Sequence, residues 1–264
     1  MSADVKIDFQ DTGRTFGFAD RPFVALEKLN LQVYDGEFVT VVGPSGCGKS
    51  TAMNIAAGLL EPTGGQCIVD GKTVRGPSPE RGVIFQQYAL FPWLTVRQNV
   101  EFGLKIKGLG KAERRQISDH YIGLVALTDF ADALPKQLSG GMKQRCAIAR
   151  AYAVNPKVLL MDEPFGALDA LTRVRMQNQL LETWSQERRT VMFVTHDVDE
   201  AVYLANRVVV MASRPGRLQE IIEVNLPYPR NDEIRLSTEF AAIRNQVWHA
   251  VYTLSDQSSI NQEE

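Results

Sequence analysis

Long apolar runs, an excess of charge of either sign and paired cysteines are all missing from this 264-residue sequence. No apolar run approaches the roughly 18 residues that a membrane-spanning helix needs, so we expect any membrane role to require a partner that spans the bilayer. The formal net charge of −2 gives no electrostatic reason to expect nucleic acid or an anionic membrane surface as a partner. The first residues also lack the basic and then apolar pattern of a secretory signal.

The cysteine content is low, and it points to a reducing compartment. Cys47, Cys67 and Cys146 lack the spacing of metal ligands and cannot all form pairs, which fits a cytoplasmic protein. What the sequence does have is an ordinary globular composition, with 44% hydrophobic and 23% charged residues. Its length is enough for one large α/β domain or for a core with a subdomain.

Residues 43–51 form the motif that most clearly indicates a function. They have the spacing G-x-x-x-x-G-K-[ST] of a phosphate-binding P-loop. The motif lies between a predicted apolar strand at 38–42 and a predicted helix. Backbone N–H groups of such a loop point at a phosphate, and the helix dipole adds to the attraction. Lys49 can reach the β- and γ-phosphates, and the Ser50 hydroxyl can hold Mg²⁺. A glycine-rich turn without a ligand is the alternative, but the strand–helix context favours a nucleoside triphosphate. The predicted ATP-binding residues are Gly43, Pro44, Ser45, Gly46, Cys47, Gly48, Lys49, Ser50 and Thr51.

The remaining pattern predicts antiparallel β-strands that lead into a parallel α/β core, with a helical insertion in the middle of the chain. Residues 5–9 and 25–33 alternate with the period of a strand, and we expect a polar loop between them that contains Phe16, Phe18 and Phe23. From residue 88 to about 153 the periodicity is helical, without a convincing strand.

Apolar runs typical of buried strands resume after the helical insertion. We expect strands at 157–161, 190–195, 207–212 and 218–224, and helices at 171–187, 198–205 and 238–254. The predicted organisation is a single domain, with a β-subdomain and α/β core at 1–87 and 154–225, a helical subdomain at 88–153, and a C-terminal extension at 226–264.

Polar residues follow several of the predicted parallel strands, at the edge where such sheets bind their ligands. Asp162 ends one strand and can bind Mg²⁺, while the next residue, Glu163, can polarise water for attack on a γ-phosphate. A salt bridge or a helix cap is the structural alternative for this pair. His196 follows another strand and can contact the γ-phosphate or the attacking water, and Gln86 can contact Mg²⁺ or water.

A second glycine motif, at 138–145, reads Leu-Ser-Gly-Gly-Met-Lys-Gln-Arg and precedes a strongly helical run. Ser139 is expected to be the N-cap, and Gly140 and Gly141 leave the first N–H groups uncovered, which predicts a second anion site. Ser-Gly-Gly alone would also fit a helix start without a ligand. Because the P-loop already covers one side of a triphosphate, a second phosphate site is surplus within a monomer. A head-to-tail, two-fold dimer resolves this, with each ATP between the P-loop of one copy and Ser139-Gly140-Gly141 of the other.

Together these motifs resemble the ATPase subunit of an ABC transporter. The parts that match in order and spacing are 43–51, Gln86, 138–145, 159–164, 167–169 and His196. The resemblance implies an ATP-sandwich dimer with Mg²⁺, in which Ser139, Gly140 and Gly141 contact the γ-phosphate in trans and Asp169 lies at the dimer seam. It also implies that Phe16 stacks on adenine, with Phe18 as its rival. Met142-Lys143 departs from the commonest form of the signature, and we do not expect this to impair ATP binding.

A finer resemblance is to importers of nitrate, taurine and aliphatic sulfonates. It rests on the segments 80–86, 90–96, 164–169, 214–217 and 226–230. Because the tail is short, we do not expect the regulatory β-domain of sugar-importer ATPases. The resemblance implies transport of a small solute such as one of these anions, with integral-membrane permease subunits and, indirectly, a solute-binding protein as partners. It implies a location at the cytoplasmic side of the cell membrane.

The segment after Gln86 carries an apolar, aromatic cluster made of Tyr88, Leu90, Phe91, Pro92 and Trp93. Fully buried, the cluster would be the core of the helical subdomain. Lining a groove, it would be the docking site for a cytoplasmic helix of a permease. Gln86 would then link the state of the γ-phosphate to the position of the groove.

Two other classes of protein remain as alternatives. A soluble ABC ATPase that acts on DNA or ribosomes usually carries two cassettes, long coiled coils, zinc motifs or basic surfaces, and none of these is visible in the sequence. A P-loop GTPase or kinase would leave the 138–145 motif unexplained, and the guanine-reading Asn-Lys-x-Asp is absent.

Overall fold

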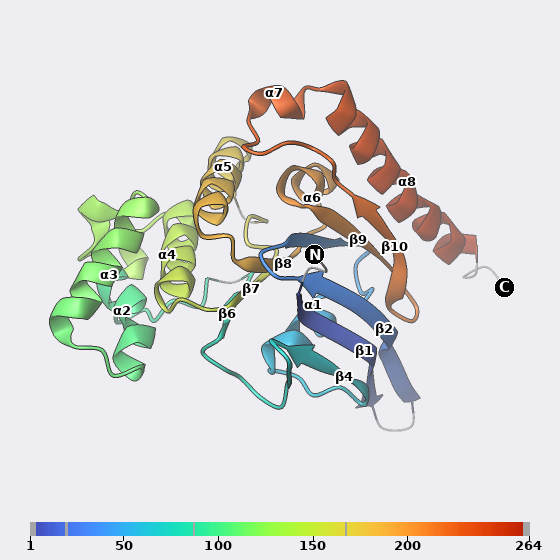
Figure 1. Cartoon of the computed structure of the whole chain (residues 1–264), viewed down its shortest axis with the longest axis horizontal. Helices are drawn as coiled ribbons and strands as arrows, with labels where there is room; N and C mark the ends of the chain where they lie inside the picture. Colours follow the sequence, from blue (N-terminus) through green and yellow to red (C-terminus); the bar gives the residue numbers. More distant parts are fainter. Residues whose placement is uncertain (1–3, 19–20, 87, 167, 261–264) are drawn as a thin grey trace. The chain divides into compact units, whose positions relative to one another are not determined.

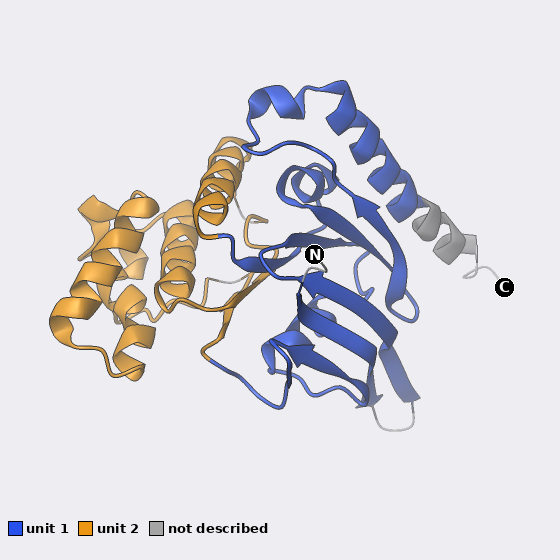
Figure 2. Ribbon diagram, viewed as in Figure 1, with its two compact units in different colours: residues 1–78, 188–264 blue, residues 79–187 orange. Residues whose placement is uncertain are grey.

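The structure of the protein is a computed structural model, and it describes residues 4–18, 21–86, 88–166 and 168–260. The side chains of Phe18 and of residues 253–260 are outside this description. The chain forms two compact units, coloured separately in Figure 2. Unit 1 combines Met1–Ser78 with Arg188–Glu264, and unit 2 is Pro79–Glu187.

Unit 1 begins with an antiparallel sheet whose strand order is β2-β1-β4-β5. The strands are β1 (Val5–Phe18), β2 (Arg21–Tyr34), β4 (Gly64–Val69) and β5 (Lys72–Thr73), and Figure 1 labels the first three. The two predicted strands at 5–9 and 25–33 are therefore found, but each is longer than expected.

The predicted polar loop around Phe16, Phe18 and Phe23 is wrong, because β1 and β2 continue through it and pair Phe16 with Phe23. Shifts of register near Thr12 interrupt the regular alternation, and Asp11 has a positive φ of 45°. A β-bulge of this kind inserts an extra residue and increases the twist of the hairpin. The polar, glycine-containing sequence reflects these bulges rather than an end of the strands.

The second sheet of unit 1 contains the strand that precedes the P-loop. Here β3 (Phe38–Val42) lies between β8 (Thr190–Val194) and β9 (Arg207–Ala212), all parallel, and β10 (Arg217–Glu223) pairs antiparallel with β9. Every residue of β3, β8 and β9 is buried, as expected for strands covered on both faces. The helices of unit 1 are α1 (Lys49–Ala57), α6 (Val198–Leu204), α7 (Asp232–Arg235) and α8 (Thr238–Ile260).

Unit 2 contains two parallel strands, β6 (Arg81–Ile84) and β7 (Val158–Asp162), and several helices. These helices are α2 (Val96–Ile106), α3 (Lys111–Leu124), α4 (Gly140–Ala153) and α5 (Ala170–Glu187), with 3₁₀ turns at Thr128–Phe130 and Pro135–Gln137. Thr95 starts α2 through a capping box, since its hydroxyl accepts from the Gln98 N–H and the Gln98 side chain accepts from the Thr95 N–H. The predicted helical segment is thus helical, and the compact unit also includes β6, β7 and α5.

None of the helices formed by the described residues is both long and apolar enough to cross a bilayer.

Candidate functional site

The P-loop of unit 1 is a tight turn between β3 and α1 that only glycine can form at several positions. Gly43, Gly46 and Gly48 have φ values of 153°, 78° and 89°. A Cβ on Gly43 would lie 2.4 Å from the Met211 carbonyl oxygen, and one on Gly48 would lie 2.7 Å from the Ala25 carbonyl oxygen. The loop therefore lies directly against the backbones of β9 and β2. These close contacts fix the conformation of its backbone.

Lys49 extends back over this loop. Its Nζ donates to the carbonyl oxygens of Gly43, at 2.7 Å, and Pro44, at 3.0 Å, and lies 3.7 Å from the Cys47 Sγ. Burial raises the pKa of the Cys47 thiol, so this sulfur stays protonated and acts as a packing group. The ammonium group and the turned backbone together form a positively polarised surface suited to a phosphate.

Replacing Gly43 by Ala is expected to raise the Kd for ATP at least about tenfold, because the new Cβ forces the loop away from Met211 and moves the N–H groups that contact phosphate. We also expect the free energy of unfolding to fall by about 2 kcal/mol. Gly46→Ala is the matched control, since a Cβ there meets no atom within 4 Å and adds only backbone strain. Equilibrium binding of a fluorescent ATP analogue and thermal unfolding measure both quantities. Equal ATP affinity in the two variants would contradict this account.

His196 follows β8, the strand next to the P-loop strand. The Thr195 N–H donates to the Val41 carbonyl oxygen at 3.1 Å, so His196 starts from the same edge of the sheet as the P-loop. Thr195 is buried, whereas His196 is exposed. Unit 1 therefore brings the predicted histidine to the edge at which a triphosphate would bind.

Phe16, the predicted adenine-stacking residue, lies in β1 of the same unit. Its half-buried ring is covered on one face by the Arg14 guanidinium, 4.7 Å from the ring centroid. Arg14 is fixed by a hydrogen bond of 2.9 Å from Nη1 to the Glu61 carbonyl oxygen. The side chain of the rival, Phe18, lies outside the described residues, and the choice of Phe16 stays a prediction.

In unit 2, the parallel pairing of β6 with β7 brings Gln86 and Glu163 together. Ile84 pairs with Met161 at the ends of the two strands, and Gln86 Nε2 donates to Glu163 Oε2 at 3.3 Å. Asp162, the last residue of β7, is half-exposed. The three polar side chains predicted at strand ends in this part of the chain thus occupy one edge of the β6–β7 pair.

Glu163 has an unusual backbone that the sequence did not reveal. Its φ is 43°, in the left-handed region that costs a side-chain-bearing residue about 1–2 kcal/mol. Such strain persists only where the surrounding structure imposes it, and it gathers at functional sites. The strained backbone therefore distinguishes Glu163 from Asp162, and the separate roles predicted for the two residues stay predictions.

The second glycine motif is a helix start, as predicted. Ser139 is the N-cap of α4, and its Oγ accepts from the Met142 N–H at 3.3 Å. Ser139 is exposed, and Gly140 and Gly141 are half-buried. A Cβ at Gly140 would lie 3.0 Å from the Tyr88 hydroxyl, and one at Gly141 would lie 3.0 Å from a methyl carbon of Thr172. The absence of side chains at the two glycines therefore leaves the N–H groups of the first turn of α4 uncovered. It also allows Tyr88 and Thr172 to pack closely against this turn.

Asp169 is exposed and lies just before α5, where its Oδ1 accepts from the Thr172 N–H at 3.0 Å. This hydrogen bond holds the pKa of the Asp169 carboxyl below its ordinary value. The structure thus gives Asp169 a helix-capping contact, and its predicted place at a dimer seam stays a prediction. Ala167, part of the same predicted motif, lies outside the described residues.

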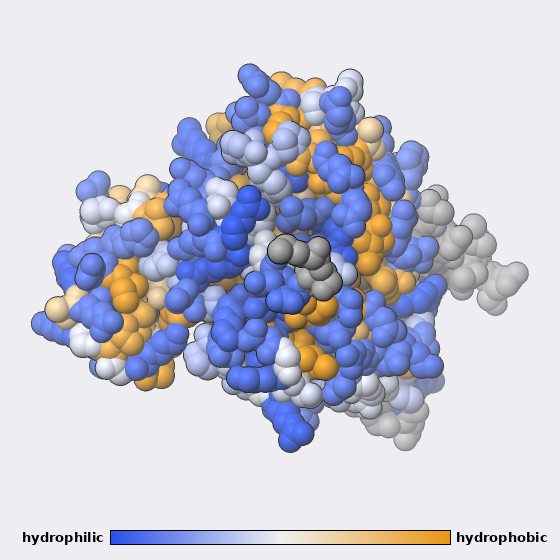
Figure 3. Space-filling model, viewed as in Figure 1, coloured by the Kyte–Doolittle hydropathy of each residue, from blue (hydrophilic) through white to orange (hydrophobic). Residues whose placement is uncertain are grey.

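The aromatic cluster after Gln86 is not fully buried. Trp93 is 70% exposed, and its ring lies 5.7 Å from the ring of Phe91, which in turn lies 4.4 Å from that of Phe102. Trp93 and Phe102 line a groove of about 320 Å³, and the rest of its lining is Leu94, Gln98, Glu101, Lys105 and Arg114. Figure 3 shows apolar side chains gathered at the α2 and α3 end of unit 2. The alternative that the whole cluster is core is therefore wrong, and we call this hollow the Trp93 groove.

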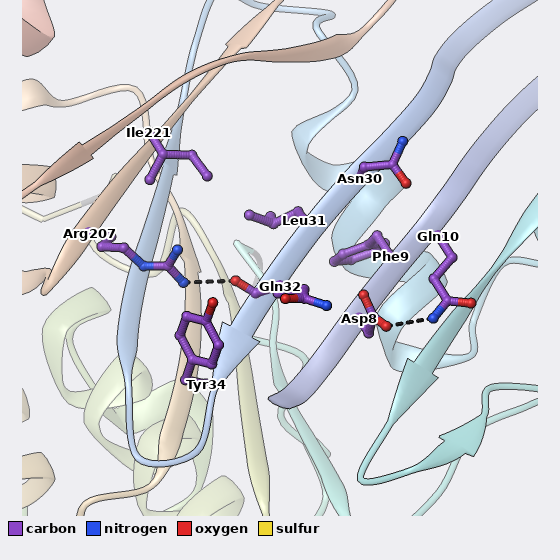
Figure 4. A pocket seen from close by; sticks show the side chains of 9 residues that line it. All are labelled: Asp8, Phe9, Gln10, Asn30, Leu31, Gln32, Tyr34, Arg207 and Ile221. Carbon is purple, nitrogen blue, oxygen red and sulfur yellow. Dashed lines mark hydrogen bonds between the residues drawn. The ribbon is translucent and has the colours of Figure 1, made fainter. Parts of the chain in front are cut away.

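A larger polar groove of about 440 Å³ on unit 1, shown in Figure 4, has a different character. Its one strong cation, Arg207, is already neutralised by two buried hydrogen bonds to the Glu37 carboxylate and also donates to the Gln32 carbonyl oxygen at 2.7 Å. The remaining lining is mostly the outward polar face of β1 and β2. The cation of this lining is thus already paired, its carboxylate, Asp8, accepts a hydrogen bond from Gln10 within the groove, and we assign the groove no function.

Known proteins share these features along most of the chain. A family model described as ABC transporter matches residues 26–166. A Brucella abortus protein named for ATP binding is 74% identical over 94% of each chain. The nitrate import ATP-binding protein of Synechocystis sp. is 48% identical over 88% of this chain and 89% of its own. The aliphatic sulfonates import ATP-binding protein of Bacillus cereus is 46% identical over 91% of this chain and 94% of its own.

Solved structures agree with the sequence comparison. A dimeric bacterial ABC transporter cassette matches 84% of this chain and 100% of its own with a TM-score of 0.76 at 33% identity. A dimeric post-hydrolysis cassette bound to ADP and Pi matches the same shares with a TM-score of 0.75 at 32% identity. The predicted fold class, an α/β P-loop NTPase core with an antiparallel β-subdomain and a helical insertion, is confirmed.

Proposed function

Because this chain belongs to the ABC transporter family of ATP-binding proteins, and is therefore an ATPase that binds ATP, we propose that it energises the import of a small solute. In this proposal two copies form a head-to-tail dimer around two ATP molecules and drive integral-membrane permease subunits. The solute is an anion such as nitrate, taurine or an alkanesulfonate, as the named functions of the Synechocystis and Bacillus relatives suggest. The protein would work at the cytoplasmic face of the cell membrane, with a solute-binding protein as an indirect partner.

The observation that carries the transport role is the exposed Trp93 groove. A tryptophan that is 70% exposed beside Phe102, with Glu101, Lys105 and Arg114 at its margin, has the composition of a protein-docking site rather than of ordinary surface. The groove lies between an aromatic segment and α2, which suits an amphipathic helix with a large apolar side chain. We therefore assign the groove to a cytoplasmic helix of the permease.

The proposed chemistry divides the site residues by role. Lys49 and the backbone of 43–51 bind the phosphates, Phe16 stacks on adenine, and the partner copy contributes Ser139, Gly140, Gly141 and Asp169. Glu163 accepts a proton from the attacking water, Gln86 orients that water, and His196 contacts the γ-phosphate.

Mg²⁺ fits the same proposal. In the described part of the chain, no group of three or more His, Cys, Asp or Glu side chains forms a metal site by itself. This suits Mg²⁺, which is usually held through one or two carboxylates together with substrate phosphates. Ser50, Gln86 and Asp162 are the proposed protein ligands, and the bound ion would neutralise charge on the β- and γ-phosphates.

Co-purification and uptake test the transport role directly. The tagged chain is isolated from membranes of its native cell, and co-purified proteins are identified. An integral-membrane permease supports the proposal, whereas nucleic acid or ribosomes alone would favour the second candidate, a soluble ABC ATPase. Vesicles that contain the complex are then tested for ATP-dependent uptake of nitrate, taurine and alkanesulfonates.

Trp93→Ala is expected to reduce the amount of co-purified permease about thirtyfold, because buried tryptophans dominate the binding energy of docking sites. ATP binding should stay within about twofold of the unchanged protein, since none of the residues that line the Trp93 groove is a predicted nucleotide-binding residue. Phe130→Ala is a control, because Phe130 is a 43% exposed aromatic of the same unit that does not line the groove. Normal recovery of the permease with Trp93→Ala would remove the groove from the docking role.

A further inference from the structure

The segment 226–230, the start of the predicted C-terminal extension, makes several polar contacts within unit 1. Arg230 is 6% exposed. Its Nη1 donates to the carbonyl oxygens of Val202, at 3.0 Å, and Tyr203, at 2.7 Å, and its Nη2 donates to that of Ala205, at 2.8 Å. The hydroxyl of Tyr228 donates to the carbonyl oxygen of Leu204 at 3.0 Å.

These acceptors are the carbonyl groups at the C-terminal end of α6. The last four carbonyls of a helix lack intrahelical partners and must find donors elsewhere. In α6 four successive carbonyls, those of residues 202–205, are satisfied by two side chains of one short segment. The positive charge of Arg230 also lies at the negative end of the helix dipole.

The segment is itself fixed in place. The Tyr228 ring lies 4.1 Å from the Arg230 guanidinium, and the Tyr203 hydroxyl donates back to the Arg230 carbonyl oxygen at 3.0 Å. Burial raises the pKa of Tyr228 to about 12, so its hydroxyl stays a donor at every physiological pH. The contact between this segment and α6 is therefore reciprocal.

The N-terminal end of α6 comes just after His196. Asp197 is the N-cap of α6, its Oδ1 accepting from the Glu200 N–H at 3.0 Å, and its own N–H donates to the Thr195 hydroxyl at 3.0 Å. That hydroxyl in turn donates to the Glu200 carboxylate, which is 4% exposed. Both neighbours of His196 are thus tied to the first turn of α6, and any shift of the helix reaches His196 through its backbone.

We infer that Arg230, supported by Tyr228, is a positioning residue for ATP hydrolysis: it fixes α6 and through it the location of His196 relative to the P-loop edge. This rests on the proposed role of His196 at the γ-phosphate. The P-loop glycines are held by direct contacts with residues outside α6, Gly43 against Met211 and Gly48 against Ala25. Loss of the Arg230 contacts should therefore impair turnover and leave ATP binding intact.

The test compares variants of the full-length chain in steady-state ATP hydrolysis and in equilibrium ATP binding. Arg230→Lys keeps the charge but loses the planar fork that reaches three carbonyls at once. We expect its kcat to fall at least about tenfold, since small displacements at a reacting centre cost up to about a hundredfold in rate, with the Kd for ATP changed less than about twofold. Tyr228→Phe loses one hydrogen bond and should lower kcat about two- to threefold.

Arg244→Gln is the matched control. Arg244 is also an arginine of the C-terminal extension that contacts α6, through an ion pair of 3.8 Å with Asp199, but this pair is exposed at the surface. The control should retain both kcat and Kd. All rates are measured well below the unfolding temperature of each variant and divided by the number of ATP-binding sites, so that partial unfolding does not imitate a loss of turnover.

A double-mutant cycle with His196→Ala identifies the route of the effect. If Arg230 acts through His196, Arg230→Lys causes little further loss in the His196→Ala background. Equal loss in both backgrounds, or unchanged kcat in Arg230→Lys alone, would overturn the inference while leaving the proposed function in place. Unchanged turnover in His196→Ala alone would instead remove His196 from the proposed function, and the inference with it.

Discussion

Glu163→Gln should retain ATP binding and lose at least about a hundredfold in turnover, because positioned general bases contribute roughly 10²–10⁴ to rates. Glutamine has the same size and can still accept from Gln86, but it has no carboxylate to take a proton from water. The variant should therefore stop after ATP binding. We expect an ATP-bound dimer to accumulate, which size-exclusion chromatography with ATP and light scattering would detect.

We expect the loss of turnover in Glu163→Gln to be large because the backbone and the carboxylate of Glu163 are both held in place. The residue has a left-handed backbone, with φ of 43°, and its carboxylate accepts from Gln86 at 3.3 Å. A side chain held at a cost of about 1–2 kcal/mol of backbone strain is not easily replaced by a neighbour. Asp162, although adjacent, ends β7 without this strained backbone and is the proposed Mg²⁺ ligand, so it should not compensate.

The control for this prediction is Glu80→Gln. Glu80 comes just before β6, at the opposite end of the β6–β7 pair, and forms an exposed ion pair of 3.5 Å with Lys157. This variant removes the same charge from the same unit and should hydrolyse ATP normally, because exposed ion pairs contribute little to stability. Normal hydrolysis in Glu163→Gln would exclude Glu163 as the base.

The parts of this protein that the sequence predicted best are those with local causes. The P-loop could be read from its glycines, since positive φ at Gly46 and Gly48 requires that residue type at those positions. The buried strands β3 and β9 were predicted with their observed bounds, because short continuous apolar runs are typical of strands covered on both faces. Helix α4 starts at Gly140 with Ser139 as its N-cap, as expected from the residue type.

The parts that could not be predicted depend on contacts between distant residues or on strain. The bulged hairpin of β1 and β2 looked like a loop, because Asp11 and its polar neighbours break the alternation without ending the strand. Arg230 reaches carbonyls 25–28 residues away, and such a contact leaves no periodic pattern. The strained backbone of Glu163 has no signal in residue type. Contacts and strain of this kind determine how the helices and strands are held together around the proposed ATP site.

Ser139→Arg is expected to leave ATP binding to each monomer within about twofold and to abolish ATP-driven dimerisation. Ser139 is exposed at the start of α4, beside two glycines that keep its first turn open, and the proposed partner of that surface is the γ-phosphate of ATP held by the other copy. A long arginine side chain would fill the space that this phosphate needs. Ser139 is not part of the 43–51 loop that is proposed to hold the nucleotide of its own copy, so those contacts should be unchanged.

The control for this prediction is Ser139→Ala, which separates a blocked surface from a weakened helix. It removes the hydrogen bond to the Met142 N–H and should cost about 1 kcal/mol of stability, yet it leaves the space for phosphate open. We therefore expect Ser139→Ala to dimerise with ATP in the Glu163→Gln background and Ser139→Arg to stay monomeric there.

A mixture of Ser139→Arg with a Lys49→Ala variant is a further test of the head-to-tail arrangement. In a head-to-tail dimer one of the two shared sites then combines an intact P-loop with an intact Ser139, so the mixture should recover part of the dimerisation that each variant lacks alone. A dimer of Ser139→Arg by itself would show that the 138–145 motif does not bind the partner's nucleotide.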